Sequence, residues 1–144
     1  MILDDEAATE RLGNELAAML RPGDVVTLSG PLGVGKTALA RAILRSLGHK
    51  GDVPSPSFAI VQPYEETDPP VWHVDLFRIE DAGELAELGL DSAAGSVLIV
   101  EWPERAGERA WSDALRLTLD FDREGARRLT ASLPPAWQER WPQQ

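Results

Sequence analysis

The sequence predicts a single α/β domain with one mixed, mostly parallel sheet, helices on both faces and a C-terminal antiparallel hairpin. A chain of 144 residues, 43% of them hydrophobic, has the size of one domain with its own core. Helices and strands alternate along the chain before a final pair of strands. A glycine-rich stretch at 30–37 lies between a predicted buried strand and a predicted helix. We therefore take 1–144 as one domain, with a tail at 134–144 that we expect to be loosely ordered.

The first part of the chain reads as helix, strand and helix. Apolar residues recur at helical spacing over 7–20, and the turn at 21–24 ends this helix. Residues 25–29 are β-branched and mostly apolar, which is typical of a buried strand. After the glycine-rich stretch, an amphipathic pattern predicts a second helix over 37–47.

Three further strands are predicted in the middle of the chain. Short apolar runs indicate strands over 58–61, 71–75 and 97–101. The segment 62–70, which begins and ends near prolines, is predicted as an exposed connection between the first two. The acidic segment 81–90 favours a short helix or a turn on a solvated face.

The last strands form the predicted hairpin. Residues 115–121 and 128–133 alternate between apolar and polar, and a polar turn at 122–126 separates them. In the tail, Trp137 and Trp141 are four residues apart, a spacing that would place them on one face of a short helix.

Composition excludes several classes of function. The formal net charge of -10 disfavours tight, direct binding to nucleic acid, because most of the surface would repel a phosphate backbone. The chain has no cysteine, which excludes disulfides, cysteine-zinc sites and thiol nucleophiles. No apolar run is long enough to span a bilayer, and the first residues do not resemble a signal peptide. We expect a cytoplasmic protein without a membrane partner.

The glycine-rich stretch matches the Walker A pattern, with Gly30, Gly35, Lys36 and Thr37 at its fixed positions. The glycines let backbone amides approach phosphate oxygens closely, and the following helix directs its positive end to the same place. The lysine reaches the outer phosphates, and the threonine hydroxyl can bind magnesium. The pattern therefore predicts a site for a nucleoside triphosphate with Mg²⁺.

Two predicted strands end in a carboxylate, Asp75 and Glu101. Ligands of open α/β sheets lie at the carboxyl ends of parallel strands, so both groups are expected to face the nucleotide. One would hold magnesium, directly or through water, and the other would orient the attacking water or sense the γ-phosphate. The residues alone leave this division open.

Two more features have a plain and a functional interpretation. Residues 55–58, Ser-Pro-Ser-Phe, are either a simple turn or a switch loop that senses the γ-phosphate. His73 is either a packed, hydrogen-bonded strand residue or a residue that acts beside Asp75.

Taken together, these motifs resemble the TsaE family, also called YjeE. The resemblance runs from about residue 6 to residue 133 and rests on four segments in a specific order. They are Gly-Pro-Leu-Gly-Val-Gly-Lys-Thr-Ala at 30–38, Ser-Pro-Ser-Phe at 55–58, His-Val-Asp-Leu-Phe-Arg at 73–78 and Glu-Trp-Pro at 101–103. The family has Asp where this chain has Pro31 and Tyr where it has Phe77, so a phosphate contact at the first position and a phenol at the second are not expected.

The resemblance implies a P-loop ATPase that serves the synthesis of threonylcarbamoyladenosine in tRNA. It implies Mg²⁺ as cofactor, a TsaB–TsaD complex as partner, weak activity without that partner, and only indirect contact with tRNA. Magnesium would be held by Thr37 and Glu101, hydrolysis would be supported by Asp75, and Ser57 would be the switch hydroxyl. The phosphates would be bound by Leu32, Gly33, Val34, Gly35, Lys36 and Thr37. Further nucleotide contacts are expected from Glu6 and Gly125.

Two alternatives are kept. A small nucleoside or nucleotide kinase would share the P-loop, although the chain shows no compact arginine-rich lid segment. A binding module that ATP switches without useful turnover would share every motif.

Overall fold

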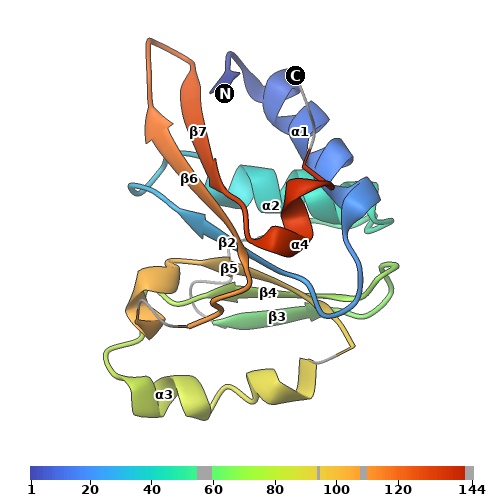
Figure 1. Ribbon diagram of the computed structural model, residues 1–144, viewed down its shortest axis with the longest axis vertical. Helices are drawn as coiled ribbons and strands as arrows, with labels where there is room; N and C mark the ends of the chain where they lie inside the picture. The colour runs from blue at the N-terminus through green and yellow to red at the C-terminus, as the bar shows by residue number, and fades with distance from the viewer. Residues whose placement is uncertain (55–59, 94, 108–109, 142–144) are drawn as a thin grey trace.

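The structure, a computed structural model, describes residues 1–54, 60–93, 95–107 and 110–141 (Figure 1). Its strands are β1 (Ile2–Leu3), β2 (Val25–Ser29), β3 (Val61–Tyr64), β4 (Val71–Asp75), β5 (Val97–Glu101), β6 (Leu115–Phe121) and β7 (Arg127–Ser132). Its α-helices are α1 (Glu6–Met19), α2 (Lys36–Ser46), α3 (Ala82–Ala86) and α4 (Pro135–Gln138). Two 3-10 helices, η1 (Leu90–Ala93) and η2 (Pro103–Ala106), complete the set.

All seven strands belong to one sheet, in the order β1-β7-β6-β2-β5-β4-β3. The four central strands, β6, β2, β5 and β4, pair in parallel, while β1, β7 and β3 are joined by antiparallel pairing. The predicted mixed α/β fold and the C-terminal hairpin are therefore confirmed. Because β2, β5 and β4 are parallel, their carboxyl ends lie at one edge of the sheet.

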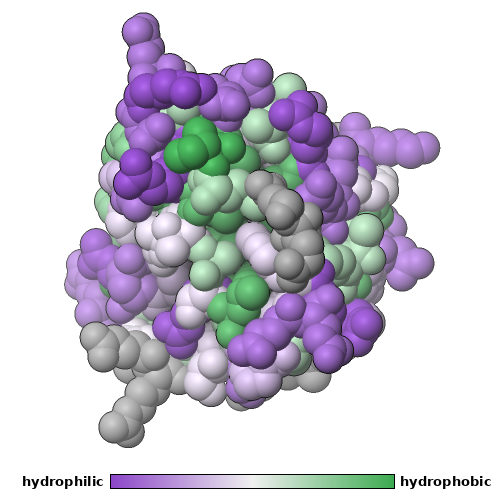
Figure 2. All heavy atoms as spheres, turned by 45° about the horizontal axis from the view of Figure 1, so that its top comes forward, coloured by the Kyte–Doolittle hydropathy of each residue, from purple (hydrophilic) through white to green (hydrophobic). Residues whose placement is uncertain are grey.

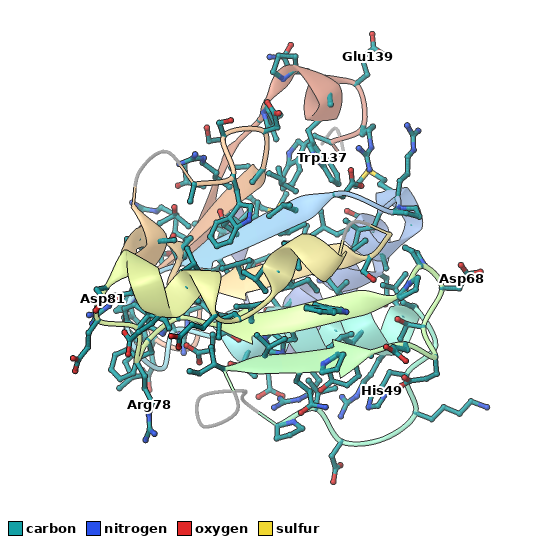
Figure 3. All side chains as sticks on the ribbon, turned by 90° about the horizontal axis from the view of Figure 1, so that it is seen from below. His49, Asp68, Arg78, Asp81, Trp137 and Glu139 are labelled. Carbon is teal, nitrogen blue, oxygen red and sulfur yellow. The ribbon has the colours of Figure 1, made fainter. Side chains whose placement is uncertain are left out.

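Helices cover both faces of the sheet, as Figures 1 and 3 show. On one face, α1 and α2 pack over a large apolar core that includes Leu16, Leu39 and Ile43. On the other face, a smaller core that includes Leu76 and Ile79 lies beneath the segment of α3 and η1. Burial on both faces explains why β2 and β5 are nearly continuous apolar runs, whereas β6 alternates.

The structure corrects the prediction for the segment before β4. The expected strand at 58–61 gives way to β3, which begins at Val61 and occupies part of the predicted connection. Residues 58 and 59 lie outside the described part of the chain. The edge position of β3 accounts for the error, because an edge strand has no ladder on its outer side and so tolerates Pro63.

Strand β1 was not predicted from the sequence. It consists of two residues that pair with β7, Ile2 opposite Arg128 and Leu3 opposite Arg127. A strand of this length has no periodic pattern of its own, so its existence depends on the pairing.

The C-terminal segment, expected to be loosely ordered, packs against the body through residue 141. Trp137 of α4 is only 1% exposed, and Figure 3 shows it turned from the helix toward the sheet. The Arg140 guanidinium lies 3.8 Å from the centre of the Trp137 ring and pairs with Asp24 at 2.5 Å. A buried aromatic ring and a partly buried ion pair thus fix this end of the chain.

The face seen in Figure 2 is covered mostly by polar residues, with smaller apolar patches between them. This polar cover agrees with the 26% of charged residues in the sequence. Within the described ranges, no helix has both the length and the hydropathy needed to cross a bilayer.

Candidate functional site

A cleft of about 350 Å³ opens where β4 and β5 end, beside the first turn of α2. Its lining combines the glycine-rich loop with both strand-end carboxylates. The lining residues are Leu32, Gly33, Gly35, Lys36, Thr37, Ala38, Asp75, Phe77, Arg78, Glu101 and Trp102. Most of the residues that the sequence singled out therefore meet in one place.

The glycine-rich loop adopts a backbone that other residues would strain. Gly30 has φ 142°, and a Cβ atom there would lie 2.3 Å from the carbonyl oxygen of Leu119. Gly35, at the start of α2, has φ 112°. Pro31 takes part in the turn through its carbonyl, which accepts a hydrogen bond from the Val34 amide at 3.2 Å. The loop is thus a compact turn that leads directly into the helix.

Lys36 is held against the loop and an aromatic ring. Its Nζ atom donates to the Gly30 carbonyl at 2.5 Å and lies 3.4 Å from the centre of the Trp102 ring. Burial lowers the pKa of Lys36, while nearby carboxylates, Glu101 first, oppose this shift. A cation that is already largely out of water is in a position to interact strongly with an anion in the cleft.

Thr37 and Glu101 bring three oxygen atoms together. The Thr37 hydroxyl lies 3.0 Å from each carboxylate oxygen of Glu101, and its single proton can be donated to one of them at a time. Oε2 of this carboxylate also lies 2.6 Å from the His73 Nε2 atom. Hydroxyl and carboxylate oxygens are ligands that Mg²⁺ accepts, so the residues present fit a magnesium ion.

Asp75 lies beside Glu101 because β4 and β5 are in parallel register, with these two residues opposite each other. Its Oδ1 atom accepts a hydrogen bond from the Phe77 amide at 2.9 Å, and the residue is 3% exposed. The amide orients the carboxylate at the end of the strand. The expectation that both strand-end carboxylates face one cleft agrees with this register.

Four predicted site residues lie elsewhere or outside the described residues. Val34 does not line the cleft, and its carbonyl accepts from Arg127 Nε at 2.9 Å. Glu6 lines a second hollow of about 230 Å³ between α1 and α2, and Ala38 lines both this hollow and the cleft. Gly125, in the hairpin turn with φ 80°, lines neither space. Ser57 lies outside the described residues.

The cleft lining also includes Phe77, Arg78 and Trp102. Phe77 and Trp102 contact each other with ring centres 5.0 Å apart at the mouth of the cleft. Arg78, labelled in Figure 3, points away from the sheet beside them. Their positions soon after Asp75 and Glu101 could have predicted that they line the cleft, since residues that follow the end of a strand lie at the same edge of the sheet. Arg127 had no comparable signal, because it contacts the loop across 93 positions of sequence.

This combination defines the class of protein. A glycine-rich loop joins a buried parallel strand to a helix, and the adjoining parallel strands end in carboxylates at the same edge. The chain is a P-loop NTPase-like α/β domain.

Comparison with known proteins identifies the family within that class. The family model described as "Threonylcarbamoyl adenosine biosynthesis protein TsaE" matches residues 3–129. The chain belongs to the TsaE family, as its motifs predicted.

Individual relatives agree with this assignment. The tRNA threonylcarbamoyladenosine biosynthesis protein TsaE of Streptomyces coelicolor is 46% identical over 113 residues, which is 76% of each chain. The protein of the same name from Rickettsia felis is 37% identical over 106 residues, 72% of this chain and 62% of that relative. The match thus spans less than two thirds of the Rickettsia protein. The crystal structure of Bacillus subtilis YdiB superposes with a TM-score of 0.81 at 26% identity, covering 96% of this chain and 87% of that one.

Proposed function

We propose that this chain binds ATP with Mg²⁺ in the cleft and hydrolyses it to ADP and phosphate. In this proposal it is the ATPase component of tRNA threonylcarbamoyladenosine synthesis and acts on a TsaB–TsaD-type complex. The observation that carries the proposal is the convergence of Lys36, Thr37, Asp75 and Glu101 on one cleft of about 350 Å³. The relatives named for this pathway support the choice of process.

The phosphates would bind at the glycine-rich loop. The first amides of α2 have no partner within the helix, and the helix dipole adds about half a positive charge at this end. Lys36 supplies a full charge at the same place. An anion bound here would compete with the Gly30 carbonyl for the lysine ammonium, whose contact with that carbonyl shows that it reaches across the loop.

Thr37 and Glu101 would hold the magnesium ion. Bound Mg²⁺ retains several water molecules and takes further oxygens from substrate phosphates, so two protein groups suffice. When bound, the ion would neutralise charge that develops on the phosphates. Asp75, with its orientation set by the Phe77 amide, would direct the attacking water.

Weak activity of the isolated chain would follow from the open rim of the cleft. Leu32 is 74% exposed and Phe77 is 42% exposed, so water has free access on this side. Electrostatic stabilisation is stronger where water is excluded, and a partner that covers the rim would supply that exclusion. The net charge of -10 supports a partner complex, rather than this chain, as the holder of tRNA.

Phosphate release with and without a TsaB–TsaD complex tests the proposal. We expect stimulation by the complex, and we expect Asp75→Asn and Glu101→Gln each to lower the stimulated rate by at least about 100-fold. Glu104→Gln is the matched control, because Glu104 is an exposed carboxylate near Lys36 that does not line the cleft. Full activity in either cleft variant would remove that residue from the mechanism.

The same assay separates the two alternatives. Transfer of labelled phosphate to a nucleoside or nucleotide would identify a small kinase. Nucleotide binding without phosphate release, even in the full complex under single-turnover conditions, would identify a switched binding module.

A further inference from the structure

His73 is a fully buried polar residue in the middle of β4, and the proposed reaction does not use it. Its exposed fraction is 0%, and its Nε2 atom lies 2.6 Å from Oε2 of Glu101. Since side chains of a strand alternate between faces, His73 and Asp75 lie on the same face of the sheet. The ring therefore extends beneath the carboxylates that border the cleft.

The direction of this hydrogen bond follows from its partners. A carboxylate that serves as a magnesium ligand only accepts hydrogen bonds, so in the proposed site the His73 Nε2 atom would be the donor. Among the described residues, the ring's other nitrogen, Nδ1, is buried and has no hydrogen-bond partner. An apolar side chain of similar volume would avoid that unpaired nitrogen, so packing alone does not explain a histidine here.

We propose that His73 is a positioning residue for Glu101. It would donate Nε2–H to Oε2 and thereby fix the orientation of the Glu101 carboxylate, which with Thr37 would hold the magnesium ion. This inference rests on the proposed function. Hydrogen-bond partners behind metal ligands orient those ligands, and their loss typically lowers metal affinity about 10–100-fold.

The proposal predicts a selective effect. Without the His73 donor, Oε2 would keep the Thr37 hydroxyl as its only hydrogen-bond partner among the described residues, and the carboxylate would be free to rotate away from its present orientation. The magnesium-dependent part of nucleotide affinity would decrease. The part that depends on Lys36 and the loop amides would remain, because Lys36 is held by the Gly30 carbonyl and the Trp102 ring.

Calorimetric titration with ADP, in saturating MgCl₂ and in EDTA, measures the two parts separately. We expect His73→Leu to reduce the magnesium enhancement of affinity by about 10-fold or more, with the affinity in EDTA nearly unchanged. His73→Gln should retain most of the enhancement, because its amide nitrogen reaches the position of Nε2 and can donate. Val71→Ala is the matched control, since Val71 is also fully buried on β4 and on the same face, but its register partner is Val97, whereas the His73 ring contacts Glu101.

Each other outcome would overturn the inference. Full magnesium enhancement in His73→Leu would show that Glu101 needs no such donor. An equal loss in MgCl₂ and EDTA, shared by Val71→Ala, would show a structural role only. If the wild-type chain bound ADP without any magnesium enhancement, the proposed magnesium site itself would fail, which the wild-type titration reveals before any variant is used.

A second measurement needs no His73 variant and so does not depend on how that variant folds. Long-range ¹H–¹⁵N spectra of the wild-type chain report which ring nitrogen carries a proton, and His49→Gln assigns the two histidines. We expect a proton on Nε2 of His73. A neutral ring with its proton on Nδ1 would overturn the inference, because Nε2 would then have nothing to donate.

Discussion

The second histidine, His49, has a very different setting from His73. It lies after α2, where its Nδ1 atom is 2.5 Å from Glu66 Oε1 and its Nε2 atom is 3.1 Å from the Asp52 carbonyl. The hydrogen bond with Glu66 raises the pKa of His49, and the same bond lowers the pKa of Glu66. The pair connects the loop after α2 to the loop between β3 and β4.

This pair should make stability depend on pH. Because the folded pKa of His49 is raised above 6.5, its contribution is complete below about pH 6.5 and is lost as pH rises through the folded pKa. For Glu66, whose pKa is lowered from 4.5, the contribution is lost instead as pH falls through its folded pKa. The pair therefore contributes most to the stability of the fold at pH values between the folded pKa of Glu66 and the folded pKa of His49.

Urea unfolding of the wild type and His49→Gln, over about pH 5.5 to 8.5, checks this prediction. The difference in unfolding free energy should shrink as pH rises. Glu66→Gln should give the same pH profile, because either change removes the pair. A difference that stays constant with pH would contradict the prediction.

Single residues of the site could be predicted where local sequence determines their position. The loop from Gly30 to Thr37 was evident from spacing alone, and Asp75 and Glu101 were evident as the last residues of apolar strands. The hydrogen bond of Arg127 to the loop and the contact of His73 with Glu101 could not be predicted. They depend on which strands become neighbours, and that is decided by pairing across the whole sheet.

At the scale of elements, α1 and α2 approach each other closely at Gly13. A Cβ atom at this position would lie 2.5 Å from Cβ of Ala42. Real Cβ atoms do not come so close, so the two helices reach their present distance only because position 13 has no side chain. Both helices pack over the main core, and α2 begins at Lys36 in the cleft.

We expect Gly13→Ala to destabilise the fold by about 1–3 kcal/mol through overpacking. The sign of this change in stability is informative, because helix propensity alone favours alanine over glycine by about 1 kcal/mol. Adding Ala42→Gly should recover part of the loss, which a double-variant cycle in urea would measure as a favourable coupling. A Gly13→Ala protein more stable than the wild type would show that the helices separate without penalty.

Helices and strands could be predicted where their own residues form a clear apolar pattern, and could not be predicted where they depend on pairing with a neighbour. Strands β2, β4 and β5 lie at the predicted residues, because a strand buried on both faces is a continuous apolar run. The edge strands β1 and β3 were missed or misplaced. One is too short for any periodicity and the other contains Pro63, so each depends on its neighbour.

At the scale of the whole molecule, the last helix joins the first elements in one core. Trp137 belongs to the same apolar cluster as Leu3 of β1 and Leu16 of α1. Asp24, just before β2, holds Arg140 beyond the helix. The C-terminal segment thus contributes to the stability of the entire domain.

Trp137→Ala should therefore lower the unfolding free energy by about 3–5 kcal/mol, the usual range for a buried tryptophan. Phe121→Ala is the control for a large aromatic residue, because Phe121 is 54% exposed and its loss should cost about 1 kcal/mol or less. Chemical unfolding followed by circular dichroism measures both. Equal effects would mean that the last helix does not share the domain's core.

Pro63 affects how the molecule can associate with other molecules. The sheet ends on one side in β1, two residues long, and on the other in β3, where proline removes a backbone donor. Short or proline-containing edges are poor templates for an added strand. Self-association by strand addition, and the aggregation it seeds in concentrated solution, is thereby discouraged at both borders. A partner would then be bound through side chains and loops rather than through an added strand.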